Sequence, residues 1–240
     1  MRLAPSRTGS QPRVRCAAAG ALGRHGAARA RRRSSPPAFC ILTLSSPAAG
    51  PSPADKSALG ADPASDGKVP ILQHDAFVLT ESLHCADYVA ALAPADKQLL
   101  PAAPHERART GLFLEAVGKF VPAFYALLMR QEASEQAAAR AALLAAAQGL
   151  AAHCARQGGP FLLGKRFSFG DLMLFPFVER LCVVQHYRGF SLDEAAAADA
   201  SLAPLVAWRD AMLQLPCVQA TLQPPAFFVA QYEPYASGKK

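Results

Sequence analysis

Two short apolar runs, separated by three residues, stand out in the first half of the chain. Val69 to Gln73 and Phe77 to Leu79 are rich in β-branched and aromatic residues, and His74-Asp75-Ala76 lies between them. This spacing predicts a β-hairpin. Proline lacks a backbone N–H, so Pro70 is expected at the start or edge of the first strand. Another apolar run of strand length, Phe39 to Leu44, lies upstream.

After the hairpin the apolar positions follow helical spacing. Thr80 or Glu81 is predicted to open a helix that runs to about Ala91. Ser168, followed three residues later by Asp171, predicts a structural capping box for a buried helix from Phe169 to about Tyr187. Further helices are predicted at residues 105–131 with a kink at Pro122, and at 134–157, 193–200, 202–215 and 216–222.

This order of elements predicts an α+β N-terminal domain followed by an all-α C-terminal domain. The N-terminal domain is expected over residues 39–92. Residues 93–104 carry three prolines and are predicted to be an interdomain linker. The helical domain is expected over residues 105–235, and residues 1–38 are expected to be disordered or a targeting segment.

The formal net charge of +7 is concentrated at the N-terminus. Residues 1–38 hold nine of the 25 basic residues and no acid, so the remainder carries 16 basic and 18 acidic residues. A basic segment on a nearly neutral body argues against nucleic-acid binding, and no uncharged apolar run is long enough to predict a membrane span. The Arg-rich, acid-free segment is typical of a transit peptide for a plastid or mitochondrion. The alternatives are a solvated basic arm on a cytoplasmic protein, or an incorrect gene start.

The six cysteines are scattered, and none forms a CxxC pair. Disulfide frameworks and zinc sites need closer or more regular spacing, so neither a disulfide framework nor a metal site is predicted. Cys85, Cys154 and Cys182 are expected to be small buried residues within helices.

Two motifs in this order resemble the glutathione transferase superfamily. The first is Val69-Pro70 with Thr80-Glu81-Ser82 at the next helix start, and the second is the segment from Gly159 to Asp171 with its capping box. Pro176-Phe-Val-Glu-Arg180 and His186-Tyr-Arg-Gly-Phe190 are similar to the omega and lambda classes. The resemblance covers roughly residues 62–235 and implies a thioredoxin-like N-terminal domain. This domain would be incomplete, because the first strand and helix of the family are not recognised in residues 1–38.

The resemblance also implies a glutathione site. Pro70 would be cis and turn the Val69 backbone toward the cysteinyl part of glutathione. Glu81 would bind the ammonium of the γ-glutamyl group, and the Ser82 hydroxyl and backbone N–H would bind its carboxylate. Ordinary helix capping is the alternative role for Glu81 and Ser82.

In omega and lambda members the reactive group is a cysteine at the first helix start, upstream of these residues. The available thiols, Cys40 and Cys16, are weak candidates, because Cys40 lies in a strand-like run and Cys16 follows Arg-rich sequence. The catalytic residue is therefore unknown. The same resemblance implies a glutathione-dependent transferase or thiol-disulfide reductase of the kind used in detoxification, with glutathione as co-substrate and a small electrophile or disulfide as second substrate.

A non-catalytic binding or protein-interaction module is the alternative function, and some family members form homodimers. Two further sets of residues have open roles. Phe113, Phe120 and Phe124 have the spacing of a core more than of a substrate pocket. The segment from His186 to Arg188 is expected to be a solvated helix end more than a pocket wall.

Overall fold

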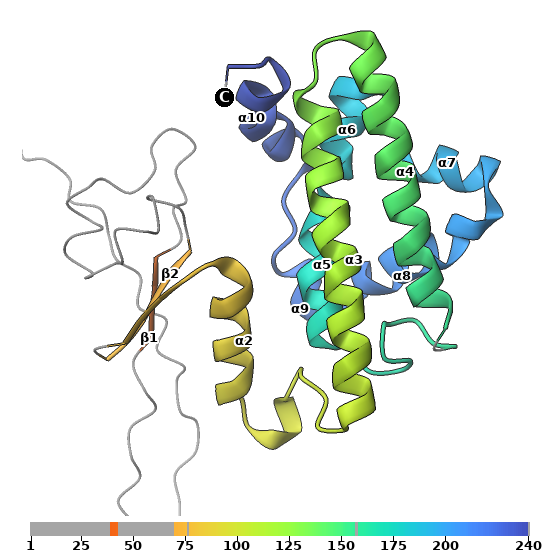
Figure 1. Cartoon of the computed structure of the whole chain (residues 1–240). Coiled ribbons are helices and arrows are strands. Elements are labelled where there is room, and N and C mark those ends of the chain that lie inside the picture. Colours follow the sequence, from red (N-terminus) through yellow and green to blue (C-terminus); the bar gives the residue numbers. More distant parts are fainter. Residues whose placement is uncertain (1–38, 43–69, 76, 157, 240) are drawn as a thin grey trace, which may run out of the picture. The chain divides into compact units, whose positions relative to one another are not determined.

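The computed structural model describes residues 39–42, 70–75, 77–156 and 158–239, and for residues 39–42 only the backbone (Figure 1). The chain divides into two compact units between Cys85 and Ala86. The domain and linker boundaries predicted from the sequence remain predictions. The described part combines a small β-sheet with a helical C-terminal region, as the α+β fold class predicted.

The first unit contains a three-stranded antiparallel sheet. Its strands are β1 (Phe39–Leu42), β2 (Ile71–His74) and β3 (Phe77–Thr80), in the order β1-β2-β3. The predicted hairpin is confirmed, because β2 and β3 pair with Ile71 opposite Thr80. Its turn contains Asp75 at a φ of 52°, a left-handed conformation that Asp tolerates better than most residues. Pro70 directly precedes β2, as expected of a residue that cannot donate to the ladder.

Helix α2 (Ser82–Leu92) follows β3, and the short 3₁₀ turn η2 (Ala95–Lys97) follows α2. The Cys85 thiol is buried and donates to the Leu79 carbonyl at 3.5 Å. Past η2, the Leu99 carbonyl accepts a hydrogen bond of 3.0 Å from the Phe169 N–H, the first residue of α5. The Pro-rich segment is therefore fixed to the helix that begins 70 residues later.

The second unit is helical. Its two long helices, α3 (Pro104–Met129) and α4 (Ala133–Ala155), lie side by side (Figure 1). Pro122 lies inside α3, which continues through it. The remaining helices are α5 (Phe169–Glu179), α6 (Leu181–Arg188), α7 (Leu192–Ala198), η3 (Ala200–Leu202), α8 (Ala203–Leu213), α9 (Pro216–Gln219) and α10 (Pro225–Ala236).

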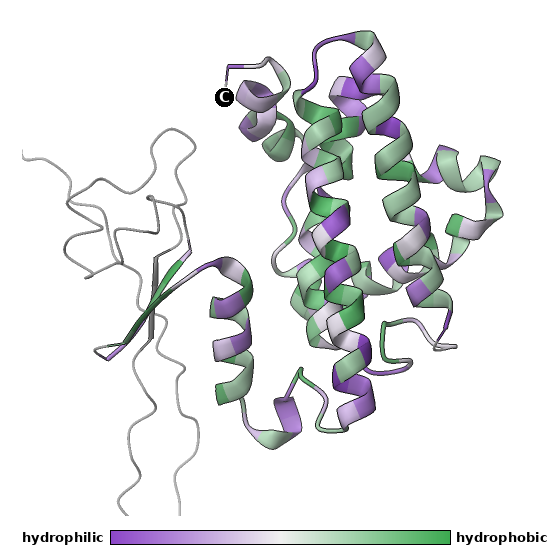
Figure 2. Ribbon diagram, viewed as in Figure 1, coloured by the Kyte–Doolittle hydropathy of each residue, from purple (hydrophilic) through white to green (hydrophobic). Residues whose placement is uncertain are grey.

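The core of this unit forms where α3, α4, α5 and α8 meet. Phe113, Phe120 and Phe124 of α3 are fully buried there, which confirms their interpretation as core. Truncating a buried phenylalanine typically costs about 3–5 kcal/mol. Helix α3 is long and apolar enough to cross a membrane by length and composition. Its buried face packs against α4, α5 and α6, however, and Figure 2 shows apolar and polar residues alternating along it.

The predicted single helix from Phe169 to Tyr187 is wrong. The chain breaks between α5 and α6 at Arg180, whose φ of −80° and ψ of 2° are not helical. Neither Gly nor Pro stands at that position, and the apolar pattern continues on both sides of it. The sequence pattern therefore gave no signal for the break. The helix predicted at 216–222 ends at Gln219. Helix α10 was not predicted, because Pro224, Pro225 and Pro234 indicate a loop.

The end of α6 is not a solvated helix end. Arg188 donates to the carbonyls of Leu127, Leu128 and Ala236, at 3.2, 2.7 and 2.7 Å. Tyr187 donates to the Val229 carbonyl at 3.0 Å. Both side chains are half-buried, and they connect the ends of α3, α6 and α10. Only His186 of the three is exposed.

The capping box at the start of α5 is formed by Ser168 and Asp171. Oδ2 of Asp171 accepts hydrogen bonds from the Ser168 N–H at 2.8 Å and from the Ser168 hydroxyl at 2.6 Å. Both side chains are fully buried. The role of these two residues is structural, because their polar atoms serve the fold of the loop and helix start.

Candidate functional site

The junction between β3 and α2 is built around a strained residue. Glu81 has a φ of 69°, which places a residue with a Cβ in the left-handed region. This conformation costs roughly 1–2 kcal/mol for an L-residue other than Gly. Such strain persists where the surrounding structure imposes it, and it gathers at ligand-binding sites. Glu81 directly precedes α2 and its carbonyl accepts the first hydrogen bond of the helix, as expected of a residue that opens it.

Two polar groups are presented at this junction. The Glu81 and Ser82 side chains are both exposed. Among the described residues, none makes a hydrogen bond or ion pair to the Glu81 carboxylate or the Ser82 hydroxyl. The Glu81 carbonyl instead accepts the Cys85 N–H at 2.9 Å, which closes the first turn of α2. A carboxylate and a hydroxyl therefore stand together at a helix N-terminus, where backbone N–H groups favour an anion.

The predicted backbone contact of this site is only partly described. Pro70 is half-buried and lies directly before β2. Val69 lies outside the described residues, so its role stays a prediction. Ile71 and Thr80 are directly opposed in the β2–β3 ladder. The strand that begins after Pro70 and the strand that ends before Glu81 therefore meet at the same end of the hairpin, and Pro70 and Glu81 lie next to that end.

The thiols differ in how far they suit catalysis. Cys40 lies in β1, opposite Gln73 of β2, and not at a helix start. Cys16 lies outside the described residues. Burial raises the pKa of the Cys85 and Cys182 thiols, and it raises the pKa of Cys154 to about 12. A reactive cysteine needs a lowered pKa, so the raised pKa of these three thiols disfavours the thiolate that a nucleophile requires.

An aromatic cluster in the helical unit was not predicted. Tyr232 and Tyr235 of α10 lie against Tyr125 of α3, with ring centroids 5.6–6.1 Å apart, and Tyr125 and Tyr232 share a hydrogen bond of 3.4 Å between their hydroxyls. Burial raises the pKa of Tyr232. The spacing of Tyr232 and Tyr235 was a usable signal, but their segment was not interpreted as a helix.

The break at Arg180 directs its guanidinium to aromatic rings. It lies 5.4 Å from the ring centre of Phe228 and 5.9 Å from that of Phe177. Such cation–π contacts contribute roughly 0.5–1 kcal/mol at exposed sites. No group of three or more His, Cys, Asp or Glu within the described part of the chain is placed to hold a metal ion.

Comparison with known proteins places these features in context. The family model described as "Glutathione S-transferase, C-terminal domain" matches residues 108–213. A relative named probable glutathione transferase omega-2, from Caenorhabditis briggsae, is 28% identical over 176 residues, which are 72% of this chain and 68% of the relative.

Solved structures share the fold. Glutathione transferase Omega 3C from Trametes versicolor superposes with a TM-score of 0.58 and 26% identity over 70% of this chain and 72% of that one. The Leishmania protein TDR1, described as a trimeric glutathione transferase, superposes with a TM-score of 0.61 and 22% identity over 72% of this chain. The superposed part covers 38% of the TDR1 chain.

The family match falls on the helical unit, and the omega relatives align with about seven-tenths of the chain. The sequence motifs of both halves agree with that assignment. Residues 108–213 therefore match the C-terminal domain of the glutathione S-transferases, and the chain is similar to glutathione transferases of the omega class over about seven-tenths of its length.

Proposed function

We propose that this protein binds glutathione at the β3–α2 junction and uses it as co-substrate in a transferase or thiol-disulfide reductase reaction. The family implies glutathione as the co-substrate. The observation that carries the assignment to this junction is the left-handed Glu81, exposed and without a partner among the described residues, beside the N-terminus of α2.

The two ends of the γ-glutamyl group match these two residues. Its ammonium complements the Glu81 carboxylate, and its carboxylate complements the Ser82 hydroxyl and the free N–H groups of the first turn. Charge-assisted hydrogen bonds of this type contribute roughly 1.5–3 kcal/mol each. The Val69 backbone would pair with the cysteinyl part of glutathione, as the family resemblance implies.

In the reductase reaction, the thiolate of a bound glutathione attacks one sulfur of the substrate disulfide. A mixed disulfide forms and the other sulfur leaves as a thiolate, which takes up a proton. A second glutathione then attacks the mixed disulfide, so that the products are oxidised glutathione and two substrate thiols. Cys40 and Cys16 are the candidates for a protein thiol that would form a mixed disulfide with glutathione. A second glutathione would attack this disulfide, so that oxidised glutathione leaves and the protein thiolate is restored.

Calorimetric titration with glutathione tests the site. Glu81→Gln keeps the shape of the side chain and removes its charge, so the Kd should rise about tenfold or more. Glu115→Gln is the matched control, because Glu115 is exposed on α3, and this change should leave the Kd unaltered. Equal affinity of the Glu81 variant and the wild type would refute the assignment of this junction.

Turnover separates the two candidate functions. Reduction of 2-hydroxyethyl disulfide by glutathione should be accelerated by the wild-type protein and lost in Glu81→Gln in parallel with binding. Binding without turnover, in the wild type, would instead establish the non-catalytic binding module. Individual replacement of Cys40 and Cys16 by serine, followed by the same assay, shows whether either thiol takes part.

A further inference from the structure

A cavity of about 340 Å³ lies wholly within the helical unit. Its size falls at the lower end of the range for small-molecule sites. Residues of α5, α6, α7, α8 and α10 line it, together with residues of the loops between these helices. The wall is largely apolar and includes Phe175, Phe190, Leu213, Leu222, Pro225 and Phe228.

One wall of the cavity carries a carboxylate with spare hydrogen-bonding capacity. Glu179, the last residue of α5, is half-buried. Among the described residues, its only hydrogen-bond donor is the backbone N–H of Gln223, another lining residue, at 3.4 Å. The neighbouring Arg180 guanidinium lies over aromatic rings and forms no ion pair with Glu179 within the described part of the chain. Burial accordingly raises the pKa of Glu179.

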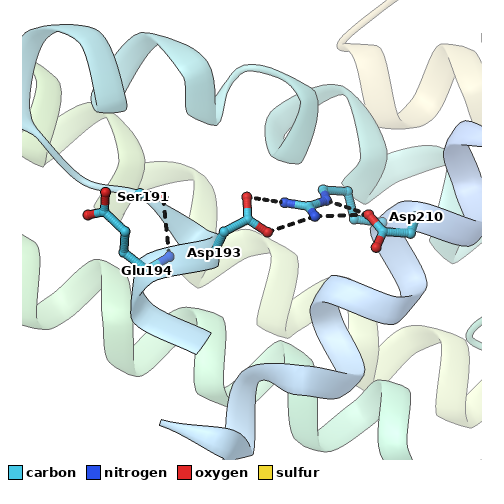
Figure 3. Close-up of polar contacts among 5 residues, drawn as sticks. Ser191, Asp193, Glu194 and Asp210 are labelled. Atoms are coloured by element: carbon cyan, nitrogen blue, oxygen red, sulfur yellow. Dashed lines mark hydrogen bonds and ion pairs between the residues drawn. The ribbon is translucent and has the colours of Figure 1, made fainter. Parts of the chain in front are cut away.

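The basic residue of the cavity lining, Arg209, is already paired with carboxylates. Arg209 binds Asp193 through two hydrogen bonds of 2.9 and 2.8 Å, and Asp210 accepts a further bond of 2.9 Å from it. Figure 3 shows Asp193 and Asp210 on either side of the guanidinium group. Arg209 therefore has no free charge to offer an anion. Of the lining residues, Glu179 and Asp193 are acidic and Arg209 is basic, so the net charge of the lining is −1.

We propose that this cavity is a binding site for small hydrophobic amines. The apolar wall would enclose a ring system, and the protonated amine would lie at the Glu179 carboxylate, where it forms the ion pair that Arg180 does not. The negative lining disfavours anions, which include glutathione and its conjugates. This site is separate from the glutathione site proposed above, and its occupant differs from glutathione in charge and polarity.

A thiol in the cavity wall provides an internal reporter. Cys182 of α6 lines the cavity and is half-buried, and burial raises its pKa. Because Cys182 lines the cavity, a ligand bound there should shield its thiol from a reagent such as iodoacetamide. Cys217 is exposed and does not line the cavity, so its modification serves as the reference within the same protein.

The test compares 1-naphthylmethylamine, a protonated amine, with 1-naphthoate, which has the same ring system and a negative charge. Calorimetry should show binding of the amine at one site and weaker binding of the naphthoate. Glu179→Gln should weaken the binding of the amine about tenfold or more and leave that of the naphthoate unchanged or improved. Glu194→Gln is the control, because Glu194 is exposed and outside the cavity lining.

Peptide mass spectrometry supplies an independent readout on the wild-type protein. The amine should slow iodoacetamide modification of Cys182 and leave that of Cys217 unchanged. The proposal is overturned if the naphthoate binds more tightly than the amine, if Glu179→Gln and Glu194→Gln bind the amine equally well, or if Cys182 is not protected. Saturating glutathione should not displace the amine, so this outcome stands apart from the test of the glutathione site.

Discussion

The indole nitrogen of Trp208 donates a hydrogen bond of 2.7 Å to Oδ1 of Asp171, although 37 residues separate them in the chain. The same oxygen accepts the Leu162 N–H at 2.8 Å. With the two bonds from Ser168, the Asp171 carboxylate therefore joins α8, the loop before α5 and the start of α5 itself. Among the described residues, none forms an ion pair with Asp171, and its buried carboxylate is stable because four donors replace its water.

Asp171→Ala is predicted to lower the free energy of unfolding by at least about 3 kcal/mol, because three buried N–H donors lose their acceptor at about 1–3 kcal/mol each. Urea unfolding followed by circular dichroism measures this change. Ser191→Ala removes an N-cap at an exposed helix start and should cost only ~1 kcal/mol. Equal costs for the two variants would contradict a joining role for Asp171.

The buried thiol of Cys154 predicts a loss of stability in alkali. Burial raises its pKa from 9.0 to about 12, and the charge of Asp171 acts in the same direction. The unfolded chain therefore releases this proton first, so the contribution of Cys154 is complete below pH 9.0 and declines as the pH rises toward about 12. Cys154→Ala removes this dependence.

Urea unfolding of the wild type and of Cys154→Ala at pH 7, 9, 10 and 11 measures the effect, with the fluorescence of Trp208, the single tryptophan, as the signal. The difference in unfolding free energy between the two proteins should shrink with each step above pH 9. Curves that stay parallel over this range would show that the Cys154 proton is not linked to folding.

The strain at Glu81 can be separated from its charge. Glu81→Gly removes both the carboxylate and the Cβ that disfavours a φ of 69°, whereas Glu81→Ala removes the carboxylate and keeps the Cβ. Both variants should lose glutathione binding. The amide of Cys85, which bonds to the Glu81 carbonyl, should exchange with solvent about fivefold more slowly in the Gly variant, from roughly 1 kcal/mol of relieved strain. Equal exchange in the two variants would mean that no strain is stored there.

The sequence predicted those parts of the fold that are marked by local signals. The hairpin was correct because Pro70 and the polar turn at Asp75 mark its limits directly. The three phenylalanines of α3 were correctly interpreted as core because their spacing follows the helical period. The break at Arg180 was missed because neither Gly nor Pro stands at that position and the apolar pattern continues on both sides of it.

The candidate site was predictable only in part. Glu81 and Ser82 were identified from the motif. The left-handed backbone of Glu81 was not predicted, because that conformation usually occurs at glycine and position 81 is a glutamate. The cavity beside Glu179 was also hidden, because its lining comes from residues spread between Phe175 and Phe228. Pairings of this kind between distant segments arise only when the helices pack.

The break at Arg180 makes the length of α5 as important as its composition. Glu179 lines the cavity while Arg180 lies over the rings of Phe177 and Phe228, so two adjacent residues serve different surroundings. Each residue advances a helix by about 100°. One inserted residue between Asp171 and Glu179 would therefore rotate both side chains away from their partners while leaving every residue type intact. Natural variation in this segment should consist of substitutions, and relatives should keep a fixed interval from the capping box to the break.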